Sequence, residues 1–209
     1  MGKRQNKGDL SEKIARIQKA GLNVTAGFIL GADGDKPEAF GAMFRFIQEN
    51  GIVFAMVGLL TAIRGTRLYE RLKKEGRLRY ESSGNNTHQF ELNFDPMTDE
   101  TALIEGYIRL LTELYSPEHY YDRCLTLQKR LGTGVARANQ ANWKNIRAML
   151  RIMYQNLIVE PSWEYIIFIA KTLVTAPKRF PEAISEAVKY EHLKEVTRTT
   201  IDEYRKSHK

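Results

Sequence analysis

The sequence is poor in cysteine, with Cys124 as the single thiol among 209 residues. One thiol forms no internal disulfide and supplies no multi-cysteine metal site. Because Cys124 lies in an apolar helical pattern, we interpret it as a small core residue, and we expect a reducing compartment, the cytoplasm. The four histidines lack metal-ligand spacing, and no Ser-His-Asp or phosphate-loop pattern is present. The residues therefore indicate no metal ligand and no catalytic residue.

Long apolar segments are missing as well. The longest apolar runs, 52–63 and 165–170, are shorter than the ~18 residues that a membrane-spanning helix requires. Residues 1–9 are charged and lack the apolar stretch of a secretory signal. We expect no transmembrane segment, and we expect a disordered basic N-terminus over residues 1–10.

Charge of one sign is in excess, since 32 Lys+Arg against 25 Asp+Glu give a formal net charge of +7. Such an excess favours nucleic acid, anionic lipid or a phosphate-bearing ligand as a partner. The basic residues are spread along amphipathic segments, however, which is typical of a solvated surface. Tyr120 and Tyr121 beside Arg123 could stack on bases, but this spacing more often packs tyrosines against neighbouring helices. We find no strong nucleic-acid signal and keep nucleic-acid binding as a third alternative.

The chain changes character near residue 95. Before that point the apolar runs 22–31 and 52–62 alternate with helical patterns, and after it almost every segment is helical. The runs are apolar on both faces, and the crossover lengths between them fit parallel strands. We predict an α/β class followed by an all-α class: a partial (β/α) barrel segment with parallel strands over residues 11–80, a linker over 81–97, and a helical C-terminal domain over 98–209.

Two segments with chemical potential follow the predicted strands. Parallel crossovers are right-handed, so both strands end at one sheet edge, where ligands bind in α/β proteins. After the first strand, Gly31 would admit a ligand close to the backbone, and Asp33 with Asp35 could serve acid–base or metal chemistry. After the second strand, Arg64 could bind a carboxylate or phosphate.

Each of these motifs also has a purely structural interpretation. Asp33-Gly34-Asp35 is an ordinary turn, and Asp35 before Pro37 and Glu38 is a good helix start. Gly65-Thr66 after Arg64 could be a turn and a helix cap. We keep Arg64, Asp33 and Asp35 as substrate or anion candidates beside this alternative.

Several segments, taken in order, resemble a known family. Residues 13–31, 44–52, 56–62 and 65–72 resemble the last strand pairs of the radical S-adenosylmethionine barrel, in the subclass with an N-terminal cobalamin-binding domain. Residues 93–94 and 105–124 resemble the uncharacterised helical domain that ends many of these proteins, hopanoid C-2 methyltransferases among them. Ordered agreement over several segments is far more specific than any single motif.

This resemblance implies a cofactor site. In the family a Gly-x-Ile-x-Gly strand packs against the adenine of S-adenosylmethionine, which implies that role for Gly27, Ile29 and Gly31. The end of the next strand lines the same pocket, which implies Thr61 and Ala62. The full-length family also uses a [4Fe–4S] cluster and cobalamin.

Departures from the family pattern change what we expect of this chain. The Cys-x-x-x-Cys-x-x-Cys loop, its strand and the cobalamin domain are absent, and Cys124 alone cannot hold a cluster. Ala32 stands where relatives commonly have an aromatic residue. We expect a C-terminal fragment of a longer enzyme, from a truncated reading frame, a split gene or excision. It would contribute part of the cofactor pocket and a helical cap, bind no cofactor alone and be inactive alone.

Two parallel strands also leave an unpaired sheet edge. We therefore expect either a separate chain that carries the missing N-terminal half or self-association through the open edge. The alternative to a partial radical S-adenosylmethionine enzyme, with methyl transfer as the parent reaction, is a non-catalytic protein-interaction module or dimer.

Overall fold

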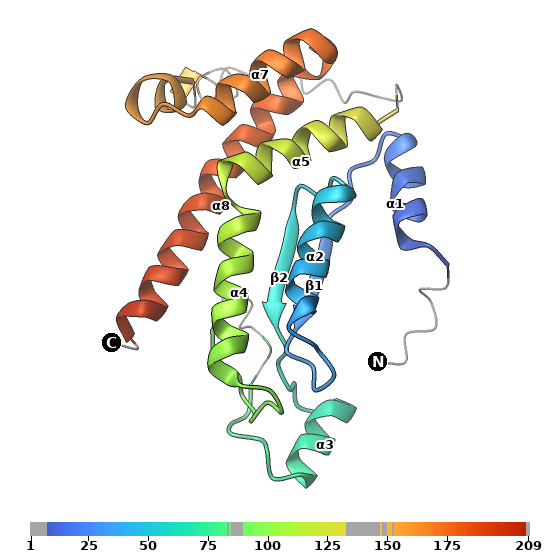
Figure 1. Ribbon diagram of the computed structural model, residues 1–209, viewed down its shortest axis with the longest axis vertical. Helices are drawn as coiled ribbons and strands as arrows, with labels where there is room; N and C mark the ends of the chain where they lie inside the picture. The colour runs from blue at the N-terminus through green and yellow to red at the C-terminus, as the bar shows by residue number, and fades with distance from the viewer. Residues whose placement is uncertain are drawn as a thin grey trace. The chain divides into compact units, whose positions relative to one another are not determined.

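The computed structural model describes residues 8–82, 84, 90–132, 147, 150–151 and 153–207 (Figure 1). Two short strands lie in the first part of the chain, and the rest of the described structure is helical. In chain order the elements are α1 (Leu10–Lys19), β1 (Ala26–Leu30), α2 (Glu38–Glu49), β2 (Ala55–Leu59), α3 (Arg67–Lys74), α4 (Glu100–Leu114), α5 (Pro117–Arg130), the π-helix η1 (Gln155–Val159), α7 (Trp163–Thr175), the 3₁₀ helix η2 (Pro177–Arg179) and α8 (Phe180–Ser207). The predicted class, an α/β segment followed by helices, is confirmed.

Strands β1 and β2 pair in parallel, from Ala26 opposite Ala55 to Leu30 opposite Leu59. Figure 1 shows both strands running in the same direction. The strands are shorter than the apolar runs 22–31 and 52–62 that predicted them. Leu22 is 60% exposed and lies outside the sheet, so the apolar run begins before the strand does.

One prediction about these strands is wrong: they are not buried on both faces. Along β1, Gly27 and Ile29 are exposed while Leu30 is buried. The register places Gly27 opposite Met56 and Ile29 opposite Gly58. Ile29 is 55% exposed and Met56 is 48% exposed. We call these four residues the open sheet face, because among the described residues nothing covers them enough to bury them.

The chain forms two compact units. The helical unit comprises residues 1–25, 45–54 and 114–195, and the sheet unit comprises residues 26–44, 55–113 and 196–209. Helices α2, α4 and α8 contribute residues to both. The domain boundaries predicted at the linker 81–97 remain a prediction.

The core of the sheet unit lies where both strands meet α3 and α4. Its buried members are aliphatic apart from one phenylalanine: Leu60, Ala62, Leu72, Leu92, Phe94 and Leu103. Phe40 of α2 packs against this core, and a Cβ on Gly106 of α4 would lie 2.9 Å from its ring. Glycine at position 106 therefore lets α4 approach α2 closely. Tyr107 of α4 donates a hydrogen bond of 2.8 Å to the Val57 carbonyl of β2.

The core of the helical unit is aromatic. Tyr121 stacks on Phe168 with ring centroids 4.9 Å apart, and Tyr120 lies 4.9 Å from Tyr190. The Tyr120 hydroxyl donates to the Glu186 carbonyl at 3.1 Å. Since Tyr120 and Tyr121 are buried here, their rings are not available to stack on nucleic-acid bases.

Helix α5 begins as its sequence predicts. Ser116 caps it by accepting a hydrogen bond from the His119 amide, and Pro117 occupies the first turn. Gly51 has φ +57°, and a Cβ there would lie 2.9 Å from the Leu127 amide nitrogen of α5. Position 51 therefore requires glycine both for its backbone conformation and for the approach of α5.

In the part of the chain that the structure describes, no helix combines the length and apolarity that crossing a bilayer demands.

Candidate functional site

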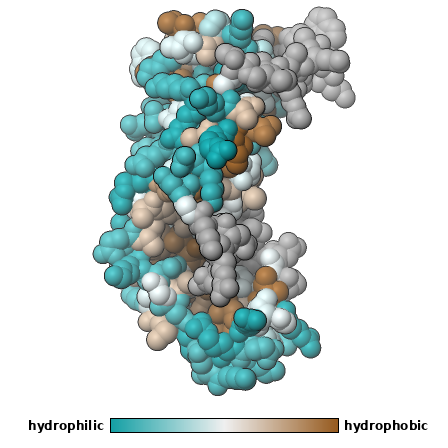
Figure 2. Space-filling view, turned by 90° about the vertical axis from the view of Figure 1, so that its right-hand side faces the viewer, coloured by the Kyte–Doolittle hydropathy of each residue, from teal (hydrophilic) through white to brown (hydrophobic). Residues whose placement is uncertain are grey.

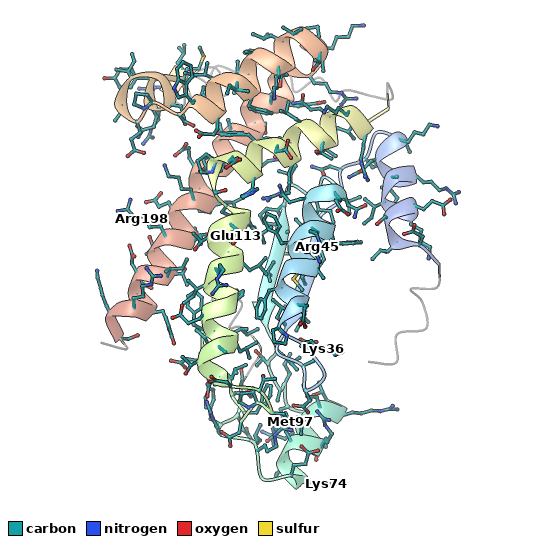
Figure 3. All side chains as sticks on the ribbon, in the orientation of Figure 1. Lys36, Arg45, Lys74, Met97, Glu113 and Arg198 are labelled. Atoms are coloured by element: carbon teal, nitrogen blue, oxygen red, sulfur yellow. The ribbon has the colours of Figure 1, made fainter. Side chains whose placement is uncertain are left out.

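The candidate site lies at the carboxyl ends of β1 and β2. Beyond the last ladder pair, the Leu60 amide still donates to the Leu30 carbonyl at 2.7 Å. Gly31 then turns the chain with φ +93°, and a Cβ there would lie 3.2 Å from Leu103. Figure 3 shows Lys36 and Met97 at this end of the sheet unit, toward α3 and its Lys74. The loop 31–35 and the segment 60–66 therefore meet at one sheet edge, as parallel pairing of the two strands requires.

Asp35 holds the loop after β1. Its Oδ2 accepts hydrogen bonds from the Gly31 amide at 2.9 Å and from the Ala32 amide at 3.0 Å. The sequence suggested that Asp35 starts a helix, but α2 begins at Glu38 and the Asp35 carboxylate binds backward along the chain. The Asp35 carboxylate therefore fixes the turn that follows Gly31.

Asp33 lies in a charged cluster with two arginines. Its carboxylate accepts from Arg77 Nη2 at 2.6 Å, Arg77 Nη1 at 3.2 Å and Arg71 Nη2 at 2.6 Å. The hydrogen bond from Arg77 and the positive charges of Arg77 and Arg71 lower the pKa of Asp33, although its partial burial acts in the opposite direction. The ionised carboxylate thus ties the loop after β1 to α3 and to the segment that follows α3.

Arg64 lies on the surface after β2. Its Nη1 is 3.4 Å from Glu81 Oε2, and the Tyr69 hydroxyl donates to Glu81 Oε1 at 2.9 Å. The hydrogen bond to Glu81 raises the pKa of Tyr69. Thr66 caps α3 by accepting from the Tyr69 amide at 3.2 Å, as the sequence suggested for Gly65-Thr66. Arg64 therefore combines an exposed guanidinium with a long ion pair to Glu81.

Asn93 fixes the backbone at Ala62. Its Oδ1 accepts from the Ala62 amide at 2.9 Å, and its Nδ2 donates to the Ala62 carbonyl at 2.9 Å and to the Tyr80 carbonyl at 3.2 Å. The buried amide thus pairs with Ala62 as a neighbouring strand would. Sequence analysis gave Asn93 no role, because 31 residues separate it from Ala62 and no local pattern links the two.

The residues predicted to bind S-adenosylmethionine divide into two groups. Gly27 and Ile29 belong to the open sheet face, and a Cβ on Gly27 would meet no atom within 4 Å. Gly31 and Ala62 are buried at the sheet edge, and Thr61 is half-buried between them and the surface. The structure thus places these residues on one face and one edge of the same sheet, and their role in binding remains a prediction.

An iron–sulfur cluster needs several thiolate ligands close together. Among the described residues no group of three or more His, Cys, Asp or Glu side chains could hold a metal ion. Cys124 is buried, and burial raises the pKa of its thiol well above the ordinary value, which disfavours the thiolate that a cluster requires. The residues of this chain therefore do not fit a [4Fe–4S] cluster.

Comparison with known proteins identifies relatives that are methyltransferases by name. An uncharacterized methyltransferase of Synechocystis is 36% identical over 126 residues, which cover 60% of this chain and 24% of that protein. A hopanoid C-2 methylase of Rhodopseudomonas palustris is 30% identical over 146 residues, 67% of this chain and 27% of the methylase. A bacteriochlorophyllide d C-12(1)-methyltransferase of Chlorobaculum tepidum is 28% identical over 102 residues, 49% of this chain and 22% of the enzyme. The chain spans about a quarter of the length of these relatives.

No solved structure matches the chain significantly. The family model for the domain of unknown function DUF4070 matches residues 66–206. That match and the three relatives confirm the resemblance to the C-terminal portion of cobalamin-type radical S-adenosylmethionine proteins. Since the matched residues make up more than half of its length, the chain belongs to the DUF4070 family.

Proposed function

We propose that this chain supplies one wall of the S-adenosylmethionine pocket, and the helical portion beside that pocket, in a cobalamin-type radical S-adenosylmethionine methyltransferase. The observation that carries the proposal is the open sheet face, formed by Gly27, Ile29, Met56 and Gly58. It occurs in a chain whose relatives are named methyltransferases and match it over about a quarter of their length.

The open sheet face suits a planar apolar group such as a purine ring. Two of its four members are glycines, which carry no side chain, and no atom of the described residues would lie within 4 Å of a Cβ on Gly27. Ile29 and Met56 provide apolar contact on either side of the two glycines. A flat ligand can therefore approach the strands closely and bury apolar side chains that are now exposed.

Hydrogen bonds and ion pairs hold the loops at the adjoining sheet edge in place before any ligand binds. Asp35 fixes the turn after Gly31, Asp33 anchors that loop to Arg71 and Arg77, and Asn93 clamps Ala62. Residues already held in place lose little conformational freedom when a ligand binds. These contacts support a binding role for the edge, and they leave the exposed guanidinium of Arg64 as the group for a carboxylate or phosphate of a ligand.

The proposal assigns neither the iron–sulfur cluster nor cobalamin to this chain. A cluster needs several thiolates, and the sequence holds one buried cysteine. Both groups would be held by another part of the enzyme, so the chain alone would be inactive. A single cysteine that remains a thiol supports a cytoplasmic location.

Nuclear magnetic resonance with labelled methyl groups tests the proposal directly. The open sheet face replaces the expectation that the chain binds no cofactor alone with an expectation of weak binding. Titrating the chain with S-adenosylmethionine up to millimolar concentration should therefore shift the Ile29 and Met56 methyl signals, because an aromatic ring placed over them changes their local magnetic field. Methyl groups of the buried aromatic core, such as those of Leu127, should stay in place. Uniform small shifts, or none up to millimolar ligand, would contradict the pocket.

A pair of valine variants sharpens this test. Gly27→Val fills the open sheet face in a strand where valine is well tolerated, so binding should be lost while the fold remains. Thr199→Val is the control, because Thr199 is exposed on α8 and belongs neither to the open sheet face nor to the loops at the sheet edge. If both variants bind equally well, the open sheet face is not the site.

The open sheet face also favours a second function, a docking module for a separate chain that carries the remaining part of the enzyme. Exposed Ile29 and Met56 on a two-stranded sheet are typical of a surface that pairs with further protein. Co-expression with a protein of the family that contains the cluster loop should then yield a stable complex, and Ile29→Glu should abolish it. A complex that survives Ile29→Glu would contradict this function.

A further inference from the structure

A second exposed apolar surface lies on the helical unit, along α7. Tyr165, Phe168 and Thr172 of this helix face the core and are buried. On the opposite side of the helix, Trp163 is 72% exposed and Val174 is 82% exposed, with Ile167 between them. The spacing of four and seven residues places all three on one stripe. The side of α7 that faces away from the core is therefore apolar as well, which is unusual for a surface helix.

Further exposed apolar residues precede α7 in the sequence. Large apolar side chains are exposed at eight positions between residues 150 and 174, and we call them the α7 apolar surface: Leu150, Tyr154, Ile158, Val159, Trp163, Ile167, Leu173 and Val174. Figure 2 shows hydrophobic residues reaching the surface at the top of the view, where Figure 1 places α7. Apolar side chains scattered singly need no explanation, but a run of this size marks a binding surface.

Basic side chains accompany the α7 apolar surface. Arg147 and Arg151 are exposed one helical turn apart, with Arg151 directly after Leu150, and Lys171 and Lys178 are exposed at the other end of the stretch. The acidic residues of the same stretch are engaged: Glu160 pairs with Lys194 at 3.2 Å, and Glu164 accepts from the Ser162 hydroxyl at 3.0 Å. The surface thus combines an apolar centre with a positive rim.

We propose that the α7 apolar surface binds the surface of an anionic lipid bilayer, with α7 lying in the plane of the interface. Interfacial segments combine bulky apolar side chains with Lys and Arg, and they place Trp and Tyr at the level of the headgroups. Trp163 and Tyr154 match the second requirement, and the four basic residues match the first. No described helix is suited to span a bilayer, so the attachment is peripheral.

Charge argues for lipid over a second copy of the chain. A two-fold dimer would place the same surface on both partners and bring like basic rims together. An anionic bilayer instead offers the opposite charge to the rim and an apolar layer to the centre. Nucleic acid would satisfy the rim but would leave the apolar centre uncovered.

The intrinsic fluorescence of Trp163 provides the assay. The sequence holds two tryptophans, so Trp143→Phe leaves Trp163 as the single reporter. Adding vesicles of phosphatidylcholine with phosphatidylglycerol should shift its emission to shorter wavelength, and the chain should sediment with the vesicles. Vesicles of phosphatidylcholine alone should bind at least about tenfold more weakly, and rising salt should weaken anionic binding.

Paired variants locate the contact. Ile167→Glu with Val174→Glu should abolish sedimentation with vesicles, because the apolar centre becomes acidic. Leu22→Glu is the matched control: Leu22 is a comparably exposed apolar residue of the same unit outside the α7 apolar surface, and binding should persist. Lys171→Glu with Lys178→Glu should lower the affinity for anionic vesicles by at least about tenfold and leave neutral vesicles unaffected.

Three results would overturn the proposal. The first is an unchanged Trp163 emission with both kinds of vesicle. The second is an equal loss of binding in Leu22→Glu. The third is a dimer, measured by light scattering without lipid, that Ile167→Glu with Val174→Glu dissociates, since that result assigns the surface to a second copy of the chain.

Discussion

Each of the two units is stabilised internally by a different kind of interaction. In the helical unit, packed rings and aliphatic side chains around Tyr121 and Phe168 exclude water. At the carboxyl ends of the strands in the sheet unit, ion pairs of Asp33 and hydrogen bonds of the Asn93 side chain hold the loops. Apolar packing fixes positions without directing polar groups at a ligand, whereas hydrogen bonds fix a loop while its surface stays accessible. Polar contacts at the sheet edge are therefore expected where a pocket must be both ordered and open.

The largest effect should come from the aromatic core of the helical unit. Phe168 is fully buried and stacks on Tyr121, so Phe168→Ala should lower the free energy of unfolding by about 3–5 kcal/mol. The matched control is Trp163→Ala on the same helix, whose exposed ring should matter by less than about 0.5 kcal/mol. Urea denaturation followed by circular dichroism measures both. Similar losses in the two variants would mean that Trp163 is covered in solution.

The Asn93 side chain and the Ala62 backbone form a hydrogen-bonded pair, which we call the amide clamp. Removing it should cause the next largest loss in the free energy of unfolding. Asn93→Ala leaves the buried Ala62 amide and carbonyl without the side chain that pairs with them, at a cost of about 2–3 kcal/mol. Amide hydrogen exchange at Ala62 should become faster in this variant at native pH. Exchange at Tyr121 in the helical unit serves as the internal control and should change less. An unchanged exchange rate at Ala62 would show that the clamp is dispensable.

Gly51 and Gly106, one in each unit, differ in whether the atoms around them can move to accommodate an added Cβ. At Gly51 a Cβ would meet the backbone of α5 at 2.9 Å, and φ is +57°, so Gly51→Ala should cost about 2 kcal/mol. At Gly106 a Cβ would meet the ring of Phe40, which can rotate away, and alanine favours the helix. Gly106→Ala should therefore cost about 1 kcal/mol or less. Adding Phe40→Leu should relieve the clash in Gly106→Ala but do nothing for Gly51→Ala.

Local patterns predicted much of the fold and only part of the site. Parallel pairing of β1 with β2 followed from two apolar runs separated by a helix, and the start of α5 followed from Ser116-Pro117. The open sheet face was missed because Ile29 is apolar, and a run of apolar letters does not reveal whether anything covers them. The exposure of Ile29 is instead the observation on which the proposed binding face rests.

The polar contacts of the site were out of reach for a different reason. Arg77 is 44 residues from Asp33, and Asn93 is 31 residues from Ala62. The chain holds 32 Lys+Arg, and asparagine is a common turn residue, so residue type alone does not single these two out. Which residues Arg77 and Asn93 contact depends on the path of the chain after α3. The spacing of apolar residues in the sequence does not predict that path.

The smallest expected effect is the contribution of Asp33 to the pH dependence of stability. It distinguishes the sheet edge, which depends on charge, from the apolar core, which does not. The pKa of Asp33 is lowered in the folded protein, first by its hydrogen bond from Arg77. A group with a depressed folded pKa stabilises the fold above its unfolded pKa, about 3.9 for aspartate, and that contribution is lost as pH falls through the folded value. Wild type should therefore lose stability between roughly pH 4 and pH 2 more steeply than Asp33→Asn, by about 1 kcal/mol.

Thermal unfolding at a series of pH values measures this difference, and taking wild type minus Asp33→Asn cancels the carboxylates that both proteins share. At neutral pH the variant should be the less stable of the two, because a neutral amide accepts only weakly from Arg71 and Arg77. The gap should close as pH falls below about 4, since protonation of wild-type Asp33 removes the charge that the variant already lacks. A gap that stays constant over the whole range would mean that Asp33 acts through shape and hydrogen-bond geometry alone, and the sheet edge would then resemble the core of the helical unit in not depending on charge.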